Sequence, residues 1–327
     1  MNASLRKLYT TLAVIIIAVV TLVAIFIPRL NQGEQSETPV LEHPEMTIQD
    51  KAILTLKEIV GLDLTKYEMN VTSIINPFDD YEGSLVEDVI CRLQSNESII
   101  IIPITFVNKT LWRIDISPYK SSLDSAHYVK RLPTDPLSAT RILLQRAQEY
   151  YQNPTYLKTM LDSLDSVNDL DSINTTIGTM KREAIVHSES IQIRFMYTFG
   201  EARDSPKSVN FNFMNGVFNG LGNGWKLFKI RNENLIVSRE QAIATALELG
   251  NKASSNELKL RNESIRADLH LLPKEPFVLH PFWFVNLPLA SPTPSSNSSE
   301  IPYTHAFTQW QVGIWADTGI IEYSHPA

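Results

Sequence analysis

The sequence contains a single cysteine, Cys91, among 327 residues. One cysteine excludes an internal disulfide framework and any zinc or iron–sulfur site built from several thiolates. Runs of basic residues are also missing and the formal net charge is −7, so the chain lacks the positive stripe typical of nucleic-acid-binding proteins. Hydrophobic residues make up 43% and charged residues 20% of the chain, which excludes a mainly disordered protein. We therefore predict a globular protein that has no nucleic-acid partner.

One long apolar run is present near the start of the chain. Residues 8–27 carry no charge and consist mainly of Ile, Val, Leu and Ala. At about 1.5 Å per residue, a helix of this length crosses a hydrocarbon core of roughly 30 Å. Because Arg6 and Lys7 precede the run, the positive-inside rule places residues 1–7 in the cytoplasm. We predict a single-pass protein of the cell membrane that contacts lipid through residues 8–27 and has its C-terminal domain outside. A cleaved signal peptide is the alternative, but its apolar region is normally shorter and ends in small residues.

An exterior location is also suggested by Asn-x-Ser/Thr sequons, which are acceptors for N-linked glycans on surface segments. Chance is the alternative explanation, because the chain is rich in Asn, Ser and Thr. The possible glycosylation sites after the apolar run are Asn70, Asn96, Asn108, Asn174, Asn262 and Asn297.

The residues after the apolar run divide into four segments. Residues 28–46 are polar and contain proline, which predicts a stalk. Residues 47–135 open with a helix that we expect Thr47 to cap and Gly61 to end; β-rich stretches at 66–75, 85–93, 99–107 and 111–116 come next and predict an antiparallel meander. Pro103 predicts an edge strand or a bulge. Residues 136–172 read as a helical spacer, with helices on either side of Asn153-Pro154.

Residues 173–327 form the last predicted segment, a second α+β module. Alternating apolar residues over 190–199 indicate a strand, and the glycine-rich stretch 219–224 indicates a turn. Ser238 and Gln241 fit a capping box for a helix that ends at Gly250. Residues 49–53 align with 239–243, and residues 112–116 align with 310–314, which suggests a duplication. The predicted fold class is thus α+β: a transmembrane helix, then two helix-plus-antiparallel-sheet modules separated by the spacer.

The last of these segments resembles a known family. The helix over residues 237–247, with its S-x-E-x-A start, and the C-terminal stretch Trp310 to Ile321, with its Asp317-Thr-Gly319 turn, resemble the PepSY domain. The match covers residues 237–323, and residues 47–117 match faintly. Trp315-Ala316 and the long loop over 288–302 depart from the family pattern. The resemblance implies an extracytoplasmic, non-enzymatic α+β module that regulates peptidases.

The residues themselves assemble no catalytic or metal-binding motif. Seven histidines are scattered without an H-E-x-x-H spacing, and no nucleophile elbow is present, so we predict neither a metal site nor a bound cofactor. Aromatic residues of the C-terminal half either line a groove for a peptide or glycan or belong to the core. The tryptophans of this possible binding surface are Trp225, Trp283, Trp310 and Trp315.

Three functions are compatible with these features. The sequence favours a membrane-anchored, extracytoplasmic interaction or regulatory protein that is not an enzyme and whose partner is an envelope protein or peptidase. In this case an exposed strand edge accepts an extended segment of the partner. The alternative is a cell-surface structural protein that binds a ligand or glycan. A surface hydrolase with carboxylates or histidines from distant positions is the least favoured.

Overall fold

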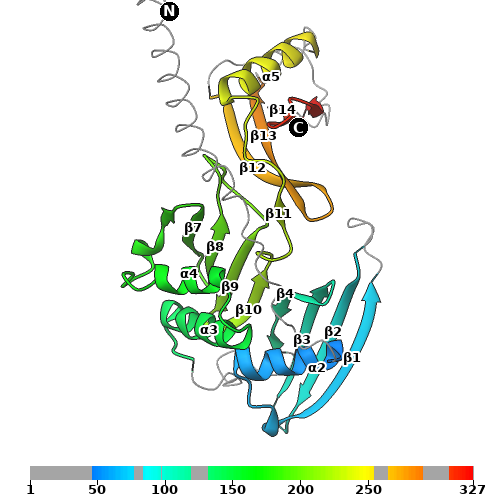
Figure 1. Cartoon of the computed structure of the whole chain (residues 1–327), viewed down its shortest axis with the longest axis vertical. Helices are drawn as coiled ribbons and strands as arrows, with labels where there is room; N and C mark the ends of the chain where they lie inside the picture. Colours follow the sequence, from blue (N-terminus) through cyan, green and yellow to red (C-terminus); the bar gives the residue numbers. More distant parts are fainter. Residues whose placement is uncertain are drawn as a thin grey trace, which may run out of the picture. The chain divides into compact units, whose positions relative to one another are not determined.

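The computed structural model of the chain describes residues 46–76, 84–96, 98–118, 132–253, 264–289 and 309–326 (Figure 1). The predicted cytoplasmic segment 1–7, the predicted transmembrane helix 8–27 and all but the last residue of the predicted stalk 28–46 lie outside the described residues. Within the described part of the chain, no helix is long and apolar enough to cross a membrane.

The first unit (residues 48–115) is a helix followed by four antiparallel strands. Thr47 accepts a hydrogen bond from the backbone N–H of Asp50 at the start of the helix, and Gly61 ends it in the left-handed conformation, so both predicted ends are confirmed. The elements are α2 (Ile48–Leu54), its π-helical continuation η1 (Thr55–Val60), the 3-10 turn η2 (Leu64–Lys66), β1 (Glu68–Asn76), β2 (Val86–Gln94), β3 (Ile99–Val107) and β4 (Thr110–Asp115). Asn108 and Lys109 both have positive φ and form the tight turn between β3 and β4 that the sequence predicts.

The second unit (residues 136–223) repeats this order of elements. Its helices are the ones predicted as a spacer, but they lead directly into strands that form a meander of their own. The elements are α3 (Pro136–Tyr150), α4 (Thr155–Ser163), the 3-10 turn η5 (Asp171–Ile173), β6 (Thr175–Ile177), β7 (Met180–Val186), β8 (Ser190–Tyr197), β9 (Ser208–Met214) and β10 (Val217–Asn223). The glycine-rich stretch predicted as a turn is strand β10, and the turn lies earlier, at Asn215 and Gly216.

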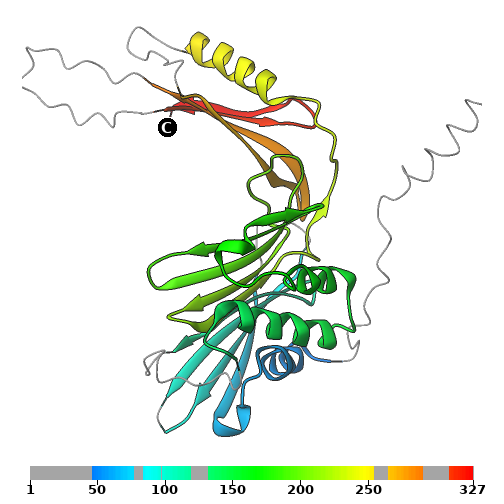
Figure 2. The same cartoon turned by 90° about the vertical axis from the view of Figure 1, so that its left-hand side faces the viewer.

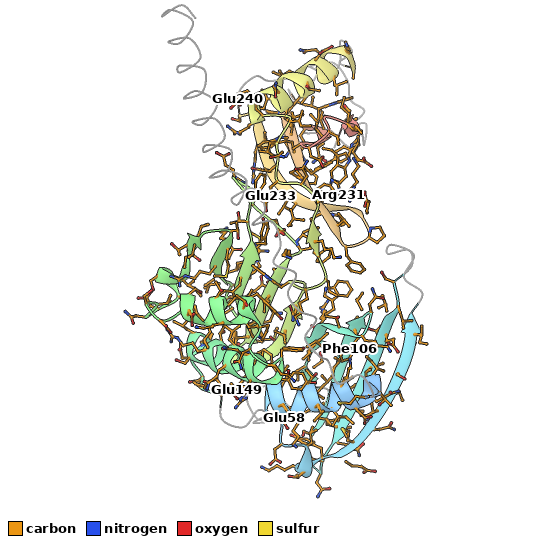
Figure 3. All side chains as sticks on the ribbon, in the orientation of Figure 1. Glu58, Phe106, Glu149, Arg231, Glu233 and Glu240 are labelled. Atoms are coloured by element: carbon orange, nitrogen blue, oxygen red, sulfur yellow. The ribbon has the colours of Figure 1, made fainter. Side chains whose placement is uncertain are left out.

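The first two units share one ten-stranded sheet. Their last strands pair antiparallel, β4 with β10, so the strand order is β1-β2-β3-β4-β10-β9-β8-β7-β6, with β5 (Ser117–Pro118) beside β3. The helices of both units cover one face of this sheet (Figure 2). Between them lies one hydrophobic core, and its largest fully buried side chains include Phe106, labelled in Figure 3. The sheet therefore runs across the boundaries predicted at 135–136 and 172–173.

The third unit (residues 239–326) forms a second sheet and a second core. Ser238 and Gln241 make the predicted capping box, in which each residue accepts the backbone N–H of the other. The helix extends three residues past Gly250. The elements are α5 (Arg239–Ala253), β12 (Arg266–Glu275), β13 (Val278–Pro288), β14 (Gln309–Trp315) and β15 (Ile321–Pro326), with β11 (Lys229–Ile230) parallel to β13. Ala242 and Ala246 of α5 are fully buried in this core.

The described residues thus contain three units in which one or two helices precede four long antiparallel strands, where the sequence predicts two such units and a spacer; the second unit also has the short strand β6. The α+β class is confirmed, and most of the described structure is antiparallel sheet. The predicted alignment of residues 112–116 with 310–314 joins strands of different rank, because Trp112 lies in the fourth strand of its unit and Trp310 in the third. A tryptophan near the end of a unit therefore does not show whether its strand is the third or the fourth of that unit.

Pro103 lies inside the sheet and not at its edge. Strand β3 pairs with β2 along its whole length, but on its other side it pairs with β4 at residues 104–107 and with β5 at residues 100–101. Pro103 falls between these two ladders. A proline is tolerated here because the missing N–H coincides with an interruption in the strand pairing.

Cys91 gives a direct test of the first core. Its side chain is completely buried in β2, and burial raises the pKa of the thiol to about 11. We expect a thiol reagent at about pH 8 to modify Cys91 at least about 100-fold more slowly than a free cysteine. The rate should rise to that of the free thiol through the urea-induced unfolding transition. Fast labelling of the native chain would contradict the placement of β2.

Candidate protein-binding edge

Three of the four tryptophans predicted to form a binding surface are buried, and they lie on two faces of one sheet. Trp283 and Trp310 belong to the core under α5. The Trp283 indole donates a hydrogen bond to the carbonyl of Val237 at 2.9 Å, and the Trp310 indole donates one to the Ser324 hydroxyl at 2.9 Å. These contacts fit the alternative interpretation, in which the indoles stabilise the core.

Trp315 lies on the opposite face of the same sheet, in an aromatic cluster. Its ring is 4.7 Å from that of Phe282 in an edge-to-face arrangement, and its indole N–H donates to Glu322 at 2.7 Å. Trp225 is distant from the other three in the sequence and is half-buried in contact with both cores. Its ring stacks on that of Tyr156, with the ring centroids 6.2 Å apart. The structure therefore does not bring the four indoles together on one exposed surface.

The sequon asparagines in the described residues are all exposed. These are Asn70, Asn96, Asn108 and Asn174, whereas Asn262 and Asn297 lie outside the described residues. Two of the exposed side chains have structural hydrogen bonds: the Asn108 side chain accepts the N–H of Leu85, and that of Asn174 accepts the N–H of Ala184. Exposure is a condition for glycosylation, which itself stays a prediction.

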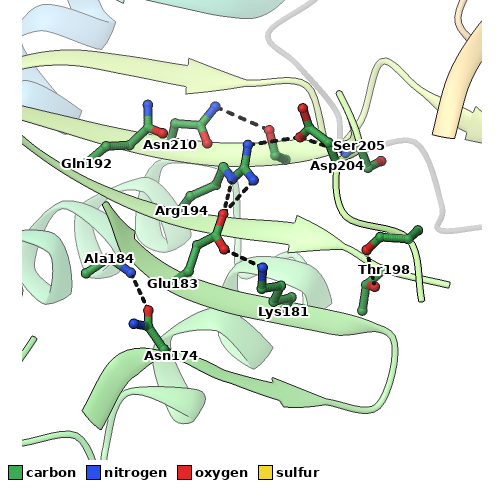
Figure 4. Close-up of polar contacts among 12 residues, drawn as sticks. Asn174, Lys181, Glu183, Ala184, Gln192, Arg194, Thr198, Asp204, Ser205 and Asn210 are labelled. Atoms are coloured by element: carbon green, nitrogen blue, oxygen red, sulfur yellow. Dashed lines mark hydrogen bonds and ion pairs between the residues drawn. The ribbon is translucent and has the colours of Figure 1, made fainter. Parts of the chain in front are cut away.

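The face of the ten-stranded sheet opposite the helices carries a row of polar side chains at β7, β8 and β9 (Figure 4). Glu183 accepts hydrogen bonds from Arg194 at 2.8 Å and forms an ion pair with Lys181 at 2.5 Å. Arg194 also contacts Asp204 at 3.0 Å. Because these charges neutralise one another, the row is better explained as a stabilising network than as a site for a charged ligand.

Glu183 makes this network sensitive to acid. Burial by itself would raise the pKa of Glu183, but the hydrogen bonds and charges of Lys181 and Arg194 outweigh it and lower the pKa below its ordinary value. A lowered pKa means that the stabilisation is present above pH about 5 and is lost as the pH falls through the folded-state pKa. We expect Glu183→Gln to flatten the decrease in the urea midpoint between about pH 5 and pH 3. The exposed Glu149→Gln variant is the control, and an equal effect of both substitutions would contradict this role.

A buried histidine–aspartate pair connects β13 to the turn after β14. The Nδ1 atom of His280 lies 2.6 Å from Oδ2 of Asp317, and both side chains are over 90% buried. The remaining polar atoms, His280 Nε2 and Asp317 Oδ1, have no hydrogen-bond partner among the described residues. Because Nε2 is closed off from solvent, we interpret the pair as structural. The described residues contain no group of three or more His, Cys, Asp or Glu side chains placed to hold a metal ion.

The outer edge of β1 has the features expected of a protein-binding site. Strand β1 is nine residues long and lies at the end of the sheet order, and no described strand pairs with its outer side. Large apolar side chains are exposed along and beside it: Met69 at 36%, Ile74 at 49%, Ile75 at 64% and the neighbouring Leu85 at 40%. Natural edge strands are normally protected by lysine, proline or bulges, but β1 contains neither lysine nor proline and pairs with β2 in unbroken register.

The other two units have a cover on the equivalent edge. In the second unit, the short strand β6 lies on the outer side of β7, which is the first of the four long strands. The first strand of the third unit, β12, is covered by residues 203–204: the Arg203 N–H donates to the Leu269 carbonyl at 2.8 Å, and the Leu271 N–H donates to the Asp204 carbonyl at 3.0 Å. In two units the chain itself thus covers this edge, with strand β6 in one and with the bridge at residues 203–204 in the other, and in the described part of the first unit it does not.

The sequence predicts a strand over residues 66–75 but does not place it at an edge. The rank of a strand in a sheet depends on which distant segments pair with it, and that information is not local. The absence of lysine and proline from β1, together with its isoleucine pair, is the signal in the sequence that could have found this edge.

No protein-family model matches the sequence, and no curated protein matches it. Among solved structures, the chain is similar to the Bacillus megaterium YpeB C-terminal domain at 11% sequence identity. The alignment covers 85% of this chain and 96% of that chain, with a TM-score of 0.31.

Proposed function

We propose that the protein is a non-enzymatic interaction module of the cell exterior, anchored in the membrane by residues 8–27, that binds an extended segment of an envelope protein along β1. The observation that carries the proposal is the apolar edge of β1, which no described strand covers, together with the segments that occupy the same edge in the other two units, β6 and residues 203–204.

Strand addition explains how such an edge binds. The outward N–H and C=O groups of β1 hydrogen-bond to an extended backbone whatever its sequence, which supplies affinity. The exposed side chains of Ile74 and Ile75 lie on opposite faces of the sheet because they are consecutive in a strand. They favour apolar residues at adjacent positions of the added segment, which supplies selectivity.

An envelope peptidase is the class of partner that the PepSY resemblance implies. The resemblance of residues 237–323 to that family and the predicted exterior location both support a regulator of this kind. In this proposal the bound segment belongs to the peptidase or to its substrate, and the protein itself contributes no catalytic group. The burial of three of the four predicted indoles removes the main support for a groove that binds glycans.

The test is capture by the full-length chain in detergent, with solubilised membranes of the source organism as the sample and mass spectrometry as the readout. Ile75→Lys places a charge on the β1 edge, where it should prevent strand addition. Ile236→Lys is the matched control, because Ile236 is also an exposed isoleucine, at 66%, in the loop before α5.

We expect an envelope protein to be enriched by the wild-type chain and by Ile236→Lys, and its recovery to fall at least about tenfold with Ile75→Lys. Equal recovery with both variants would contradict the assignment of β1. If nothing is enriched by any of the three chains, the interaction proposal itself is contradicted.

A further inference from the structure

The last strands of the first two units pair with each other. In the ten-stranded sheet, β4 and β10 run antiparallel, with Ile114 opposite Leu221, and the helices of both units lie on the same face. This is the arrangement that a two-fold axis perpendicular to the sheet would produce. Each unit covers the last-strand edge of the other.

The third unit has no such partner in the described part of the chain. Its last strand, β15, ends the order of the second sheet, and only β14 pairs with it among the described strands. The opposite edge of that sheet is covered by residues 203–204. Ile320, which precedes β15, is 54% exposed, and Ile321, its first residue, is 42% exposed. Of the last strands of the three units, β15 is the one whose outer edge no described residue covers, and this apolar pair lies at that edge.

We propose that β15 binds β15 of a second copy of this chain, so that two third units join as the first two units do. The contact is isologous, since a two-fold axis perpendicular to the sheet places the same strand on both sides of it in antiparallel orientation. It joins two copies of the second sheet edge to edge and leaves both α5 helices on the same face. The β4–β10 junction and the proposed β15–β15 junction each join the last strands of two units. Strand β1 differs from them because it is the first strand of its unit.

The side chains of β15 are compatible with self-pairing. Along the strand from Ile321 to Pro326, Glu322 is the one acidic residue, lysine and arginine are absent, and the one proline is the last residue. The register of β15 with β14 shifts once, between Ile321 and Tyr323, so the regular part available for pairing is residues 323–325. The Glu322 carboxylate already accepts a hydrogen bond from the Trp315 indole, which directs it toward its own unit. Tyr323 and His325 lie on the same face with their rings 5.2 Å apart, and an antiparallel pairing centred on Ser324 places Tyr323 of each copy opposite His325 of the other.

A cysteine scan tests the pairing in the full-length chain in detergent. Single cysteines are placed in turn at residues 321–325, and covalent dimer is measured after mild oxidation, with the unmodified chain as the background from the buried Cys91. In an antiparallel dyad, the two copies of a residue separate by about 7 Å for each position away from the axis. A disulfide needs Cβ atoms about 3.5–4.5 Å apart.

We expect the yield of covalent dimer to show one sharp maximum at a position within β15. If that position is not residue 321, adding Ile321→Lys to the corresponding cysteine variant should lower its dimer yield at least about tenfold. The control is Thr72→Cys in β1, which should give no more dimer than the unmodified chain. A flat profile across 321–325, or more dimer at residue 72 than anywhere in β15, would overturn the proposal. So would a monomeric mass for the wild-type chain in sedimentation at the same concentration, a measurement that does not depend on any variant folding.

Discussion

Replacement of Gly313 by valine is expected to lower the free energy of unfolding of the third unit by about 3 kcal/mol. A Cβ atom at this position of β14 would lie 2.6 Å from Cε1 of Tyr323 and would also overlap the ring of Phe282. Both rings belong to the aromatic cluster around Trp315, so neither can move without disturbing the other. The change should be visible as a lower urea midpoint of tryptophan fluorescence, since three of the five tryptophans lie in this sheet.

The control for this substitution is Gly222→Ala in β10. A Cβ atom there would meet Nδ2 of Asn210 at 3.2 Å, and that amide is the end of a side chain that can move. We expect a change of less than about 1 kcal/mol. Similar losses from both substitutions would contradict the close packing assigned to Phe282 and Tyr323.

Replacement of Asp317 by alanine is the second large expected effect, with a loss of about 3 kcal/mol in the free energy of unfolding. The substitution leaves the Nδ1 atom of His280, whose side chain is over 90% buried, without its partner at 2.6 Å. Burial of an unpartnered polar group costs more than the bond itself contributes. Chemical denaturation at about pH 7 measures the loss.

Two further variants separate the pair from the packing around it. Asp317→Asn keeps an oxygen that can accept the Nδ1–H, so we expect a loss of about 1 kcal/mol. The double variant His280→Leu with Asp317→Ala should be more stable than Asp317→Ala alone, because no polar atom is left unpartnered. If the double variant is the less stable of the two, the His280–Asp317 bond is not the source of the effect.

Local chemistry was enough to predict most elements of the described structure. Thr47, Gly61 and the Ser238–Gln241 capping box marked helix ends through hydrogen bonds and backbone conformations that involve only neighbouring residues. The stretch 220–224 shows the limit of such local signals. Gly220 and Gly222 lie within strand β10, where the amides of Asn212 and Asn210 approach them from the next strand, and only the pairing reveals that these glycines are needed in a strand.

The association of units was not predictable from the sequence. The helices over 136–172 carry no mark that distinguishes a spacer from the start of a new unit, because the difference lies in the strands after them and in the pairing of β4 with β10. For the same reason, the candidate site could not be predicted from the sequence.

Ile75 and Leu85 look like ordinary residues of a strand and its flank, and only the position of β1 at the end of the sheet leaves them exposed. The His280–Asp317 pair likewise joins residues 37 positions apart.

Amide hydrogen exchange along β1 tests the proposed function most directly. It is measured on the full-length chain in detergent, with and without the envelope protein recovered by capture. Strand addition predicts slower exchange of the outward-facing amides of Glu68–Asn76, while exchange in β8 and β9 at the centre of the second unit stays the same. Unchanged exchange in β1 while the envelope protein is bound would contradict the account.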